Sequence, residues 1–282
     1  METAIFGSKG QLGRDLALVF SGSGEVYGGD LPEVDIADEK RVAAFLDNRD
    51  PAVVINAAAF TDVEGAEDRE EEAFRANALG ARVIARAAYA KGVPVVYFST
   101  DYVFGGGKTT PYVPEDVPAP IGVYARSKLA GETATREENP QHLIVRTAWL
   151  YGPGGTNFVE KVLRAARTRR TLKGVTDEVG SPTHTWDLAQ ATLALFRAGA
   201  RGTFHAVNAD ACSRYEWVKT ILELAGLDVP VVPCASSEFP TKATRPLYSV
   251  LSSEKLERAT DYTMRNWKEA LRHYMERRPD HS

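Results

Sequence analysis

A tyrosine and a lysine four residues apart, Tyr124 and Lys128, have the types and spacing for proton transfer to a carbonyl oxygen. On a helix, this spacing puts both side chains on one face. Free tyrosine has a pKa of about 10, and a neighbouring ammonium group lowers that pKa by favouring the phenolate. Because this spacing is common by chance, its interpretation depends on the rest of the chain.

A glycine-rich segment near the start of the chain gives the pair a context. Gly7, Gly10 and Gly13 form a G-x-x-G-x-x-G pattern between an apolar run and an amphipathic run. Glycines there allow a sharp turn and a close approach to a pyrophosphate, which the following helix N-terminus attracts. The position predicts a dinucleotide site, although a plain glycine-rich turn would have the same pattern.

An acidic residue about 20 positions after such a loop binds the ribose hydroxyls. Asp30 has this spacing, and Asp35 competes for the role or lies nearer the adenine. A carboxylate at Asp30 favours NADH over NADPH because it repels a 2′-phosphate. A solvated loop carboxylate is the alternative, since Gly28 and Gly29 obscure where the strand ends.

A third catalytic group is expected at the end of the strand that faces the Tyr124 helix. Ser99 and Thr100 follow an apolar run at residues 93–98, and ligands of parallel sheets bind beyond the carboxyl ends of strands. The Thr100 hydroxyl can hydrogen-bond a substrate carbonyl oxygen, or it can cap the strand end. With the glycine loop, these residues predict a nicotinamide-dependent carbonyl reduction in which Lys128 also binds the cofactor ribose.

The elements that must position these residues alternate along the first half of the chain. Strands are predicted at residues 3–6, 25–27, 52–56, 93–98 and 142–147, and helices at 12–20, 41–47, 70–91 and 124–137. This α/β alternation predicts a Rossmann-type doubly wound parallel sheet.

The alternation changes after residue 150. Helices are predicted at residues 157–170 and 185–198, and a proline-bearing loop region at 230–246. We expect a dinucleotide-binding domain over residues 1–150, to which segments from roughly 175–210 return. A smaller, interleaved C-terminal substrate domain is expected over residues 151–282.

Composition excludes several classes of protein. The chain has 282 residues, 44% of them hydrophobic and 26% charged, with a net charge of −4. That charge argues against a nucleic-acid binder. The two cysteines, Cys212 and Cys234, lack metal-ligand spacing and fit a reducing compartment. The N-terminal residues do not form a signal peptide, and no apolar run is long enough for a membrane span. A cytoplasmic protein that binds neither nucleic acid nor membrane is expected.

The chain resembles the extended short-chain dehydrogenases and, within them, the dTDP-4-dehydrorhamnose reductase family. The resemblance covers nearly the whole chain and rests on residues 7–13, 56–61, 99–104, 124–128, 146–152, 180–183 and 243–246. Residues 7–13 and 124–128 identify only the superfamily, whereas 99–104 and 243–246 are far more discriminating. It implies an NAD(P)H-dependent oxidoreductase of dTDP-rhamnose biosynthesis, the pathway to a cell-surface polysaccharide component. The reaction would reduce the C4 keto group of dTDP-4-dehydro-L-rhamnose to dTDP-L-rhamnose.

The resemblance also implies residue roles. Tyr124 would protonate the forming alkoxide, Lys128 would tune Tyr124, and Thr100 would bond the reacting oxygen. The expected cofactor contacts are Gly7, Gly10, Gln11, Leu12, Asp30, Asp35, Ile36, Ala57, Ala59, Tyr124 and Lys128. The expected substrate contacts are Thr61, Thr100, Asp101, Trp149, Asn157 and Arg245. Arg245 also qualifies on charge alone, since a diphosphate suits arginine, although it could be a solvated loop cation.

Two residues depart from the family pattern, and the resemblance also suggests a way in which the protein could assemble. Phe60 and Tyr248 replace residue types common in the family and could alter substrate choice. The resemblance raises a homodimer bridged by Mg²⁺, with Asp15 as a candidate ligand. No metal is expected in the catalytic site.

Four other functions are compatible with the same fold in principle. A 4,6-dehydratase needs a carboxylate after Asp101, where this chain has Tyr102. A nucleotide-sugar epimerase stays open, as does another 4-ketoreductase. A catalytically silent regulatory subunit stays open too, although Thr100, Tyr124 and Lys128 are all present. His184, His205, Trp186 and Asn77 are expected to have structural roles.

Overall fold

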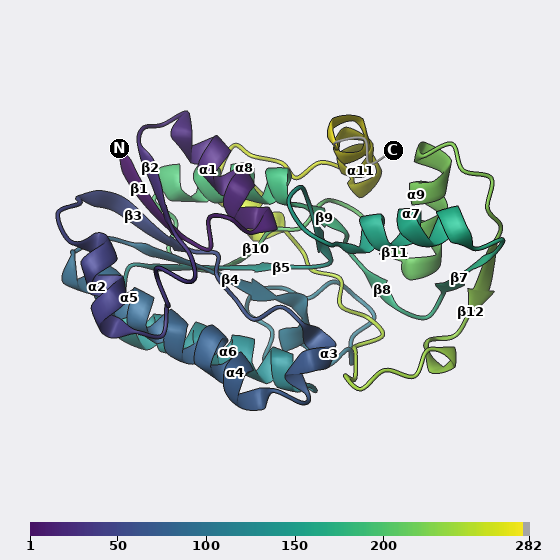
Figure 1. Cartoon of the computed structure of the whole chain (residues 1–282), viewed down its shortest axis with the longest axis horizontal. Coiled ribbons are helices and arrows are strands. Elements are labelled where there is room, and N and C mark those ends of the chain that lie inside the picture. The colour runs from purple at the N-terminus through teal and green to yellow at the C-terminus, as the bar shows by residue number, and fades with distance from the viewer. Residues whose placement is uncertain (279–282) are drawn as a thin grey trace.

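Six parallel strands form the central sheet of the computed structural model, which describes residues 1–278. Residues 279–282, the end of the predicted second domain, lie outside the described residues. The strand order is β10-β5-β4-β3-β1-β2 (Figure 1). The strands are β1 (Glu2–Phe6), β2 (Val26–Gly29), β3 (Pro51–Asn56), β4 (Val95–Thr100), β5 (His142–Thr147) and β10 (Gly202–His205). The order reverses between β1 and β3, where ligands of such sheets bind, and the predicted fold class is confirmed.

Helices cover both faces of this sheet, which explains why its central strands are mostly apolar. On one face, α1 (Gln11–Ser21) and α8 (Thr185–Arg197) pack over β1, β3, β4 and β5. On the other face lie α2 (Glu39–Leu46), α5 (Gly80–Ala90) and α6 (Val123–Glu138) (Figure 1). Each face has its own apolar core, so the carboxyl edge of the sheet is held from both sides.

The helix predicted over residues 70–91 is not continuous, and that prediction was wrong in this respect. The structure has α4 (Glu70–Phe74), a π-helical turn η1 (Arg75–Leu79) and then α5. Such turns carry one extra residue and often occur at functional sites. A short helix, α3 (Val63–Ala66), precedes them.

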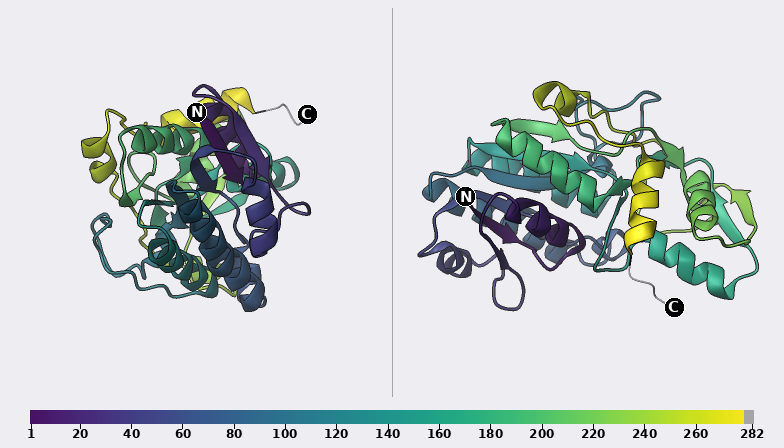
Figure 2. Two further views of the ribbon diagram at one scale, coloured as in Figure 1. Left: turned by 90° about the vertical axis from the view of Figure 1, so that its left-hand side faces the viewer. Right: turned by 90° about the horizontal axis from the view of Figure 1, so that it is seen from above.

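A second lobe lies beside the sheet, with α11 (Trp267–Arg277) between the two (Figure 2). Its core is built around Trp217, which is fully buried. Its helices are α7 (Phe158–Thr168) and α9 (Arg214–Leu224). Three two-stranded sheets pair β6 (Leu150–Tyr151) with β9 (Thr183–His184), β7 (Leu172–Val175) with β12 (Val231–Cys234), and β8 (Val179–Gly180) with β11 (Cys212–Ser213).

The second half of the chain contributes to both lobes. Helix α8 and strand β10 return to the large sheet, and α10 (Glu254–Ala259) packs beside them. The region predicted as loop at 230–246 contains strand β12, so that part of the prediction was wrong. The domain boundary near residue 150 stays a prediction. Within residues 1–278, no helix is both long and apolar enough to cross a membrane.

Candidate active site

Thr100 and Tyr124 meet at the carboxyl edge of the sheet. Thr100 is the last residue of β4 and caps the 3₁₀ turn η2 (Asp101–Val103). Its Oγ1 accepts a hydrogen bond from the backbone N–H of Tyr102 at 3.2 Å and donates to Oδ1 of Asp101 at 3.0 Å. The Tyr124 side chain, on the first turn of α6, lies beside Thr100, and the Thr100 hydroxyl acts to lower the pKa of Tyr124. A phenol and an alcohol therefore converge where a carbonyl oxygen could accept from both.

The pKa of Tyr124 is raised, not lowered. Burial is the main cause, and the Asp101 charge adds to it, while the Thr100 hydroxyl works against it. The expectation that Lys128 lowers the pKa of Tyr124 was therefore wrong for this structure. A raised pKa keeps the phenol protonated at neutral pH, as a proton donor in a reduction requires.

Lys128 lies one turn further along α6 and is buried. Burial lowers the pKa of Lys128 to about 7, although the nearby Glu132 carboxylate opposes the shift. Glu132 is itself fully buried and forms a two-pronged ion pair with Arg146 of β5, with both N–O distances at 2.8 Å. This pair joins the catalytic helix to the sheet.

The glycine loop lies against the segment that follows β3. Gly7 has a left-handed φ of +81°, and a Cβ on it would lie 2.5 Å from the backbone nitrogen of Ala58. A Cβ on Gly13 would lie 2.0 Å from the carbonyl oxygen of Gly7. Gly10 is the N-cap residue of α1, and Gln11 begins the helix. Only glycine permits this packing at Gly7 and Gly13, which leaves the N-terminus of α1 at the β1/β3 switch point.

The two candidate ribose carboxylates have different partners. Asp30, just after β2, accepts hydrogen bonds from Ser8 Oγ at 2.5 Å and from the backbone N–H of Lys9 at 3.2 Å. Asp30 is therefore bonded to the glycine loop and is not simply solvated. Asp35 forms an ion pair with Arg75 at 2.6 Å, and this pairing lowers the pKa of its carboxyl group.

The remaining cofactor candidates lie next to Asp35, in the segment after β3 and at the start of α1. Ile36 lies against Gly80, whose missing side chain leaves it room. Ala57 and Ala59 are half-buried in the segment after β3, and Thr61 is exposed there. Leu12 is buried in the first turn of α1. The glycines, the free N–H groups of α1 and the two carboxylates together fit an adenine dinucleotide.

Asn77 fixes the segment after β3 to the catalytic helix. Its Oδ1 accepts from the N–H of Phe60 at 2.9 Å, and its Nδ2 donates to the carbonyl oxygen of Phe60 at 3.0 Å. The same Nδ2 donates to Ser127 Oγ at 2.9 Å. The structure thus gives Asn77 the structural role expected of it. The π-helical turn places this side chain where it can bridge the two elements.

Arg245 belongs to residues 240–247, a segment that we call the strap. The strap crosses from the second lobe to α3 (Figure 1). Arg245 is partly buried and pairs with Glu64 of α3. Glu64 also accepts from the backbone N–H of Lys242 at 2.8 Å. Arg245 is therefore an ordered cation at the junction of the lobes and not a freely solvated one.

Arg214 is a candidate substrate residue that the sequence analysis missed. Its guanidinium carbon lies 3.4 Å from the ring centroid of Trp149, and a nitrogen lies 3.4 Å from Glu178. Its charge also lowers the pKa of Asp101, although burial outweighs this and raises that pKa to about 6. Trp149 itself has a left-handed φ of +44°, an uncommon conformation for an aromatic residue. Arg214, the first residue of α9, gave no signal in the sequence, because its chemistry depends on Trp149, which is distant in sequence.

Asn157, a substrate candidate, and Asp15, a candidate for a metal between subunits, are both buried and bonded inside the protein. Asn157 is buried, caps α7, and donates from Nδ2 to the carbonyl oxygen of Gly152 at 2.9 Å, so its polar atoms already have partners. Asp15 is also buried and bonded to Thr185, so it cannot bridge two subunits through Mg²⁺ from the surface. Within residues 1–278, no group of three or more His, Cys, Asp or Glu side chains is arranged for a metal ion.

The histidines and cysteines singled out in the sequence are internal. Burial lowers the pKa of both His184 and His205 to about 3, which keeps the two rings neutral. Cys212 and Cys234 are buried free thiols. These side chains belong to the packed interior, as the sequence analysis expected for the two histidines.

A glycine phosphate loop, a strand-end threonine and a Tyr-x-x-x-Lys helix on one doubly wound sheet define the short-chain dehydrogenase/reductase class. The family comparison is more specific. The model of the RmlD substrate binding domain matches residues 1–279, so the chain belongs to this family.

Individual relatives agree with this assignment. A dTDP-4-dehydrorhamnose reductase of Mycobacterium tuberculosis is 42% identical over 95% of this chain and 90% of its own length. The crystal structure of a dTDP-4-dehydrorhamnose reductase from Clostridium acetobutylicum has a TM-score of 0.95 and 41% identity, covering 98% and 99% of the two chains. That of Bacillus anthracis, solved in complex with NADP, has a TM-score of 0.94 and 36% identity, covering 98% of each chain.

Proposed function

We propose that this protein reduces the C4 keto group of dTDP-4-dehydro-L-rhamnose, using NADPH or NADH, to give dTDP-L-rhamnose. The observation that supports this most is the meeting of Thr100 and Tyr124 at the carboxyl edge of the sheet, with Lys128 one turn further along α6, on the same sheet that carries the glycine loop at its β1/β3 switch point. The relatives named above are reductases of this substrate, and they align with nearly the whole chain.

The roles of the residues follow from their positions. The bound nicotinamide supplies the hydride. Tyr124 holds its proton at neutral pH and gives it to the C4 oxygen as negative charge develops there. Thr100 can turn its hydroxyl from Asp101 towards the same oxygen. Lys128 donates hydrogen bonds to the cofactor ribose, and these bonds are stronger when its amino group is charged.

The substrate's other end is assigned to cations of the second lobe and the strap. Arg245 and Arg214 each have a carboxylate partner, Glu64 and Glu178, that a diphosphate could replace. Trp149 offers an aromatic surface next to Arg214 for the sugar or base. Asp101 and Thr61 complete the proposed substrate contacts.

Cofactor choice is part of the proposal. Asp30 favours NADH through its charge, whereas the Bacillus anthracis relative was solved with NADP. Both cofactors therefore belong in the test. A cytoplasmic location and a homodimer stay predictions from the sequence.

The decisive experiment compares the protein with its Tyr124→Phe variant. Offered dTDP-4-dehydro-L-rhamnose and each cofactor, the unaltered protein should consume NAD(P)H steadily, followed by nicotinamide absorbance. The variant should lose about 10²- to 10⁴-fold in kcat, the usual contribution of general acid catalysis, and still bind NADPH. Tyr151→Phe, which changes a buried tyrosine of the second lobe, is the matched control and should stay active.

The same assay separates the alternatives. An epimerase would convert the sugar nucleotide without net consumption of NADPH. A silent regulatory subunit would bind the cofactor and show no turnover, and its Tyr124→Phe variant would behave like the unaltered protein. Turnover of a different 4-keto sugar nucleotide in preference to this one would correct the substrate alone.

A further inference from the structure

Tyr97 of β4 lies directly beneath Lys128. The Lys128 Nζ atom is 4.3 Å from the centroid of the Tyr97 ring, within the range of a cation–π contact. Both side chains are buried, at 1% exposure for Tyr97 and 3% for Lys128. Removal from water strengthens such a contact, because the ammonium group has few other sources of stabilisation there.

The Tyr97 hydroxyl fixes the orientation of that ring. It lies 3.0 Å from the carbonyl oxygen of Asn77 and 3.3 Å from that of Lys128, so one donated proton is shared between two elements. The ring reaches this position only because α6 has a glycine there. A Cβ on Gly131 would lie 2.2 Å from the Tyr97 hydroxyl.

Few charged groups surround Lys128. On its own helix, Tyr124 precedes it by four residues and Glu132 follows it by four. Strand β4 contributes Tyr97, which is neutral because burial raises its pKa far above the usual value. Strand β5 contributes Arg146, which is already paired with Glu132. Glu132 also pairs with Arg136, so its charge is shared between two arginines and only part of it serves Lys128.

We propose that Tyr97 is a positioning residue for the reduction, because its ring face holds the Lys128 ammonium group charged and directed at the cofactor ribose. The inference rests on the proposed role of Lys128. It adds a group from the sheet, buried behind the catalytic helix, to the residues on which the chemistry depends.

The test measures NADPH affinity against pH for the unaltered protein, Tyr97→Phe and Tyr97→Leu. NADPH affinity should fall with rising pH as Lys128 loses its proton, and we call this decrease the alkaline limb. The limb should be absent from Lys128→Met. Tyr97→Leu should move the limb down by about one pH unit, because it removes the ring face. Tyr97→Phe keeps the face and should move it by less than half as much.

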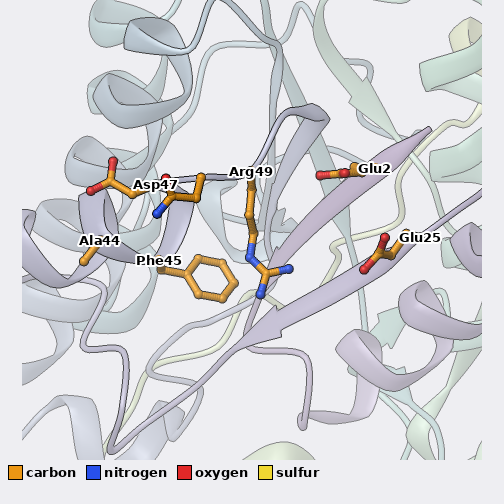
Figure 3. A pocket seen from close by; sticks show the side chains of 7 residues that line it. Glu2, Glu25, Ala44, Phe45, Asp47 and Arg49 are labelled. Atoms are coloured by element: carbon orange, nitrogen blue, oxygen red, sulfur yellow. The ribbon is translucent and has the colours of Figure 1, made fainter.

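A matched control separates this effect from a general loss of packing. Tyr27 of β2 is also buried and also carries a cation over its ring, with the Arg49 guanidinium carbon 4.0 Å from the centroid. Figure 3 shows Arg49 beside Phe45, Glu2 and Glu25. Tyr27→Leu should lower the melting temperature and leave the limb where it was.

The outcomes distinguish this inference from the proposed function. If Tyr97→Leu keeps the original limb, or Tyr27→Leu moves it equally, Tyr97 has no positioning role. A limb that persists in Lys128→Met contradicts the proposal as well. Cofactor binding is measured without the sugar nucleotide. If the protein binds NADPH but does not reduce the keto sugar, the proposed function is contradicted and the inference about Tyr97 is not.

Discussion

Asp101 is a single residue at which function and stability oppose each other. It is 2% exposed and accepts hydrogen bonds from Thr100 and from Ser249, the latter at 2.5 Å. Burial nevertheless raises the pKa of its carboxyl group to about 6. A carboxylate that ionises less readily in the folded protein than in the unfolded chain lowers stability wherever it is charged.

The Asp101→Asn substitution should therefore stabilise the protein in a pH-dependent way. The folded pKa of about 6 lies above the model value of 3.8, so the stability cost is absent below pH 3.8 and complete above pH 6. At pH 8 the variant should gain up to about 3 kcal/mol in unfolding free energy, measured by urea denaturation, and little at pH 4. Asp35→Asn, which removes a carboxylate paired with Arg75, should instead destabilise at pH 8. An equal gain for Asp101→Asn at both pH values would refute the charge explanation.

Residues could be predicted where local pattern determines their place. Tyr124 and Lys128 follow from helical spacing, and Thr100 follows from its place at a strand end. Arg214 could not be found in this way, because Trp149 and Glu178, its partners, lie on other elements. The same is true of the raised pKa of Tyr124, which depends on burial that no spacing reveals.

At the scale of elements, helix α6 is fitted closely to the π-helical turn η1 and to β4. Asn77 bonds Ser127 across this contact, and Tyr97 reaches the Asn77 carbonyl past Gly131. The sequence predicted one helix over residues 70–91, and most of that range is helical. The π-helical turn could not be foreseen, because its bonding partners are 17 and 50 residues away.

Replacing Gly131 by alanine tests this fit. Alanine favours a helix interior over glycine by about 1 kcal/mol. The added Cβ, however, would lie 2.1 Å from the carbonyl oxygen of Asn77, so we expect a net loss of about 1–3 kcal/mol in a urea denaturation experiment. Thr133→Ala on the exposed side of the same helix should be neutral or slightly stabilising. Stabilisation by both substitutions would show that the contact is looser than described.

At the scale of the whole molecule, the residues proposed for the cofactor and the cations proposed for the sugar nucleotide lie mainly in different lobes. The glycine loop, Asp30 and Lys128 belong to the large sheet lobe, whereas Arg214 belongs to the second lobe. The strap carries Arg245 back to α3 and so joins the two. Reduction requires the nicotinamide and the sugar to meet at Tyr124, where the lobes adjoin.

This division predicts that Arg245→Leu affects one ligand alone. Loss of a charge-assisted contact to the diphosphate should raise KM for the sugar nucleotide about 10- to 100-fold. The dissociation constant for NADPH, measured by fluorescence, should stay within about twofold, because the cofactor residues lie elsewhere. Lys242→Leu is the control, since Lys242 is on the same strap but exposed and paired with Asp68. Equal weakening of both ligands by Arg245→Leu would mean that the strap supports the whole fold.

The contact between the strap and α3 has a consequence for how the protein is made. Glu64 is bonded to residues 178 to 181 positions later in the chain. On the ribosome, the N-terminal part of a chain emerges and begins to fold first. The glycine loop, Thr100 and the Tyr124 helix are thus synthesised well before the strap. A nascent chain therefore contains every residue proposed for the coenzyme before Arg214 and Arg245, the two cations proposed for the diphosphate of the sugar nucleotide, have been made.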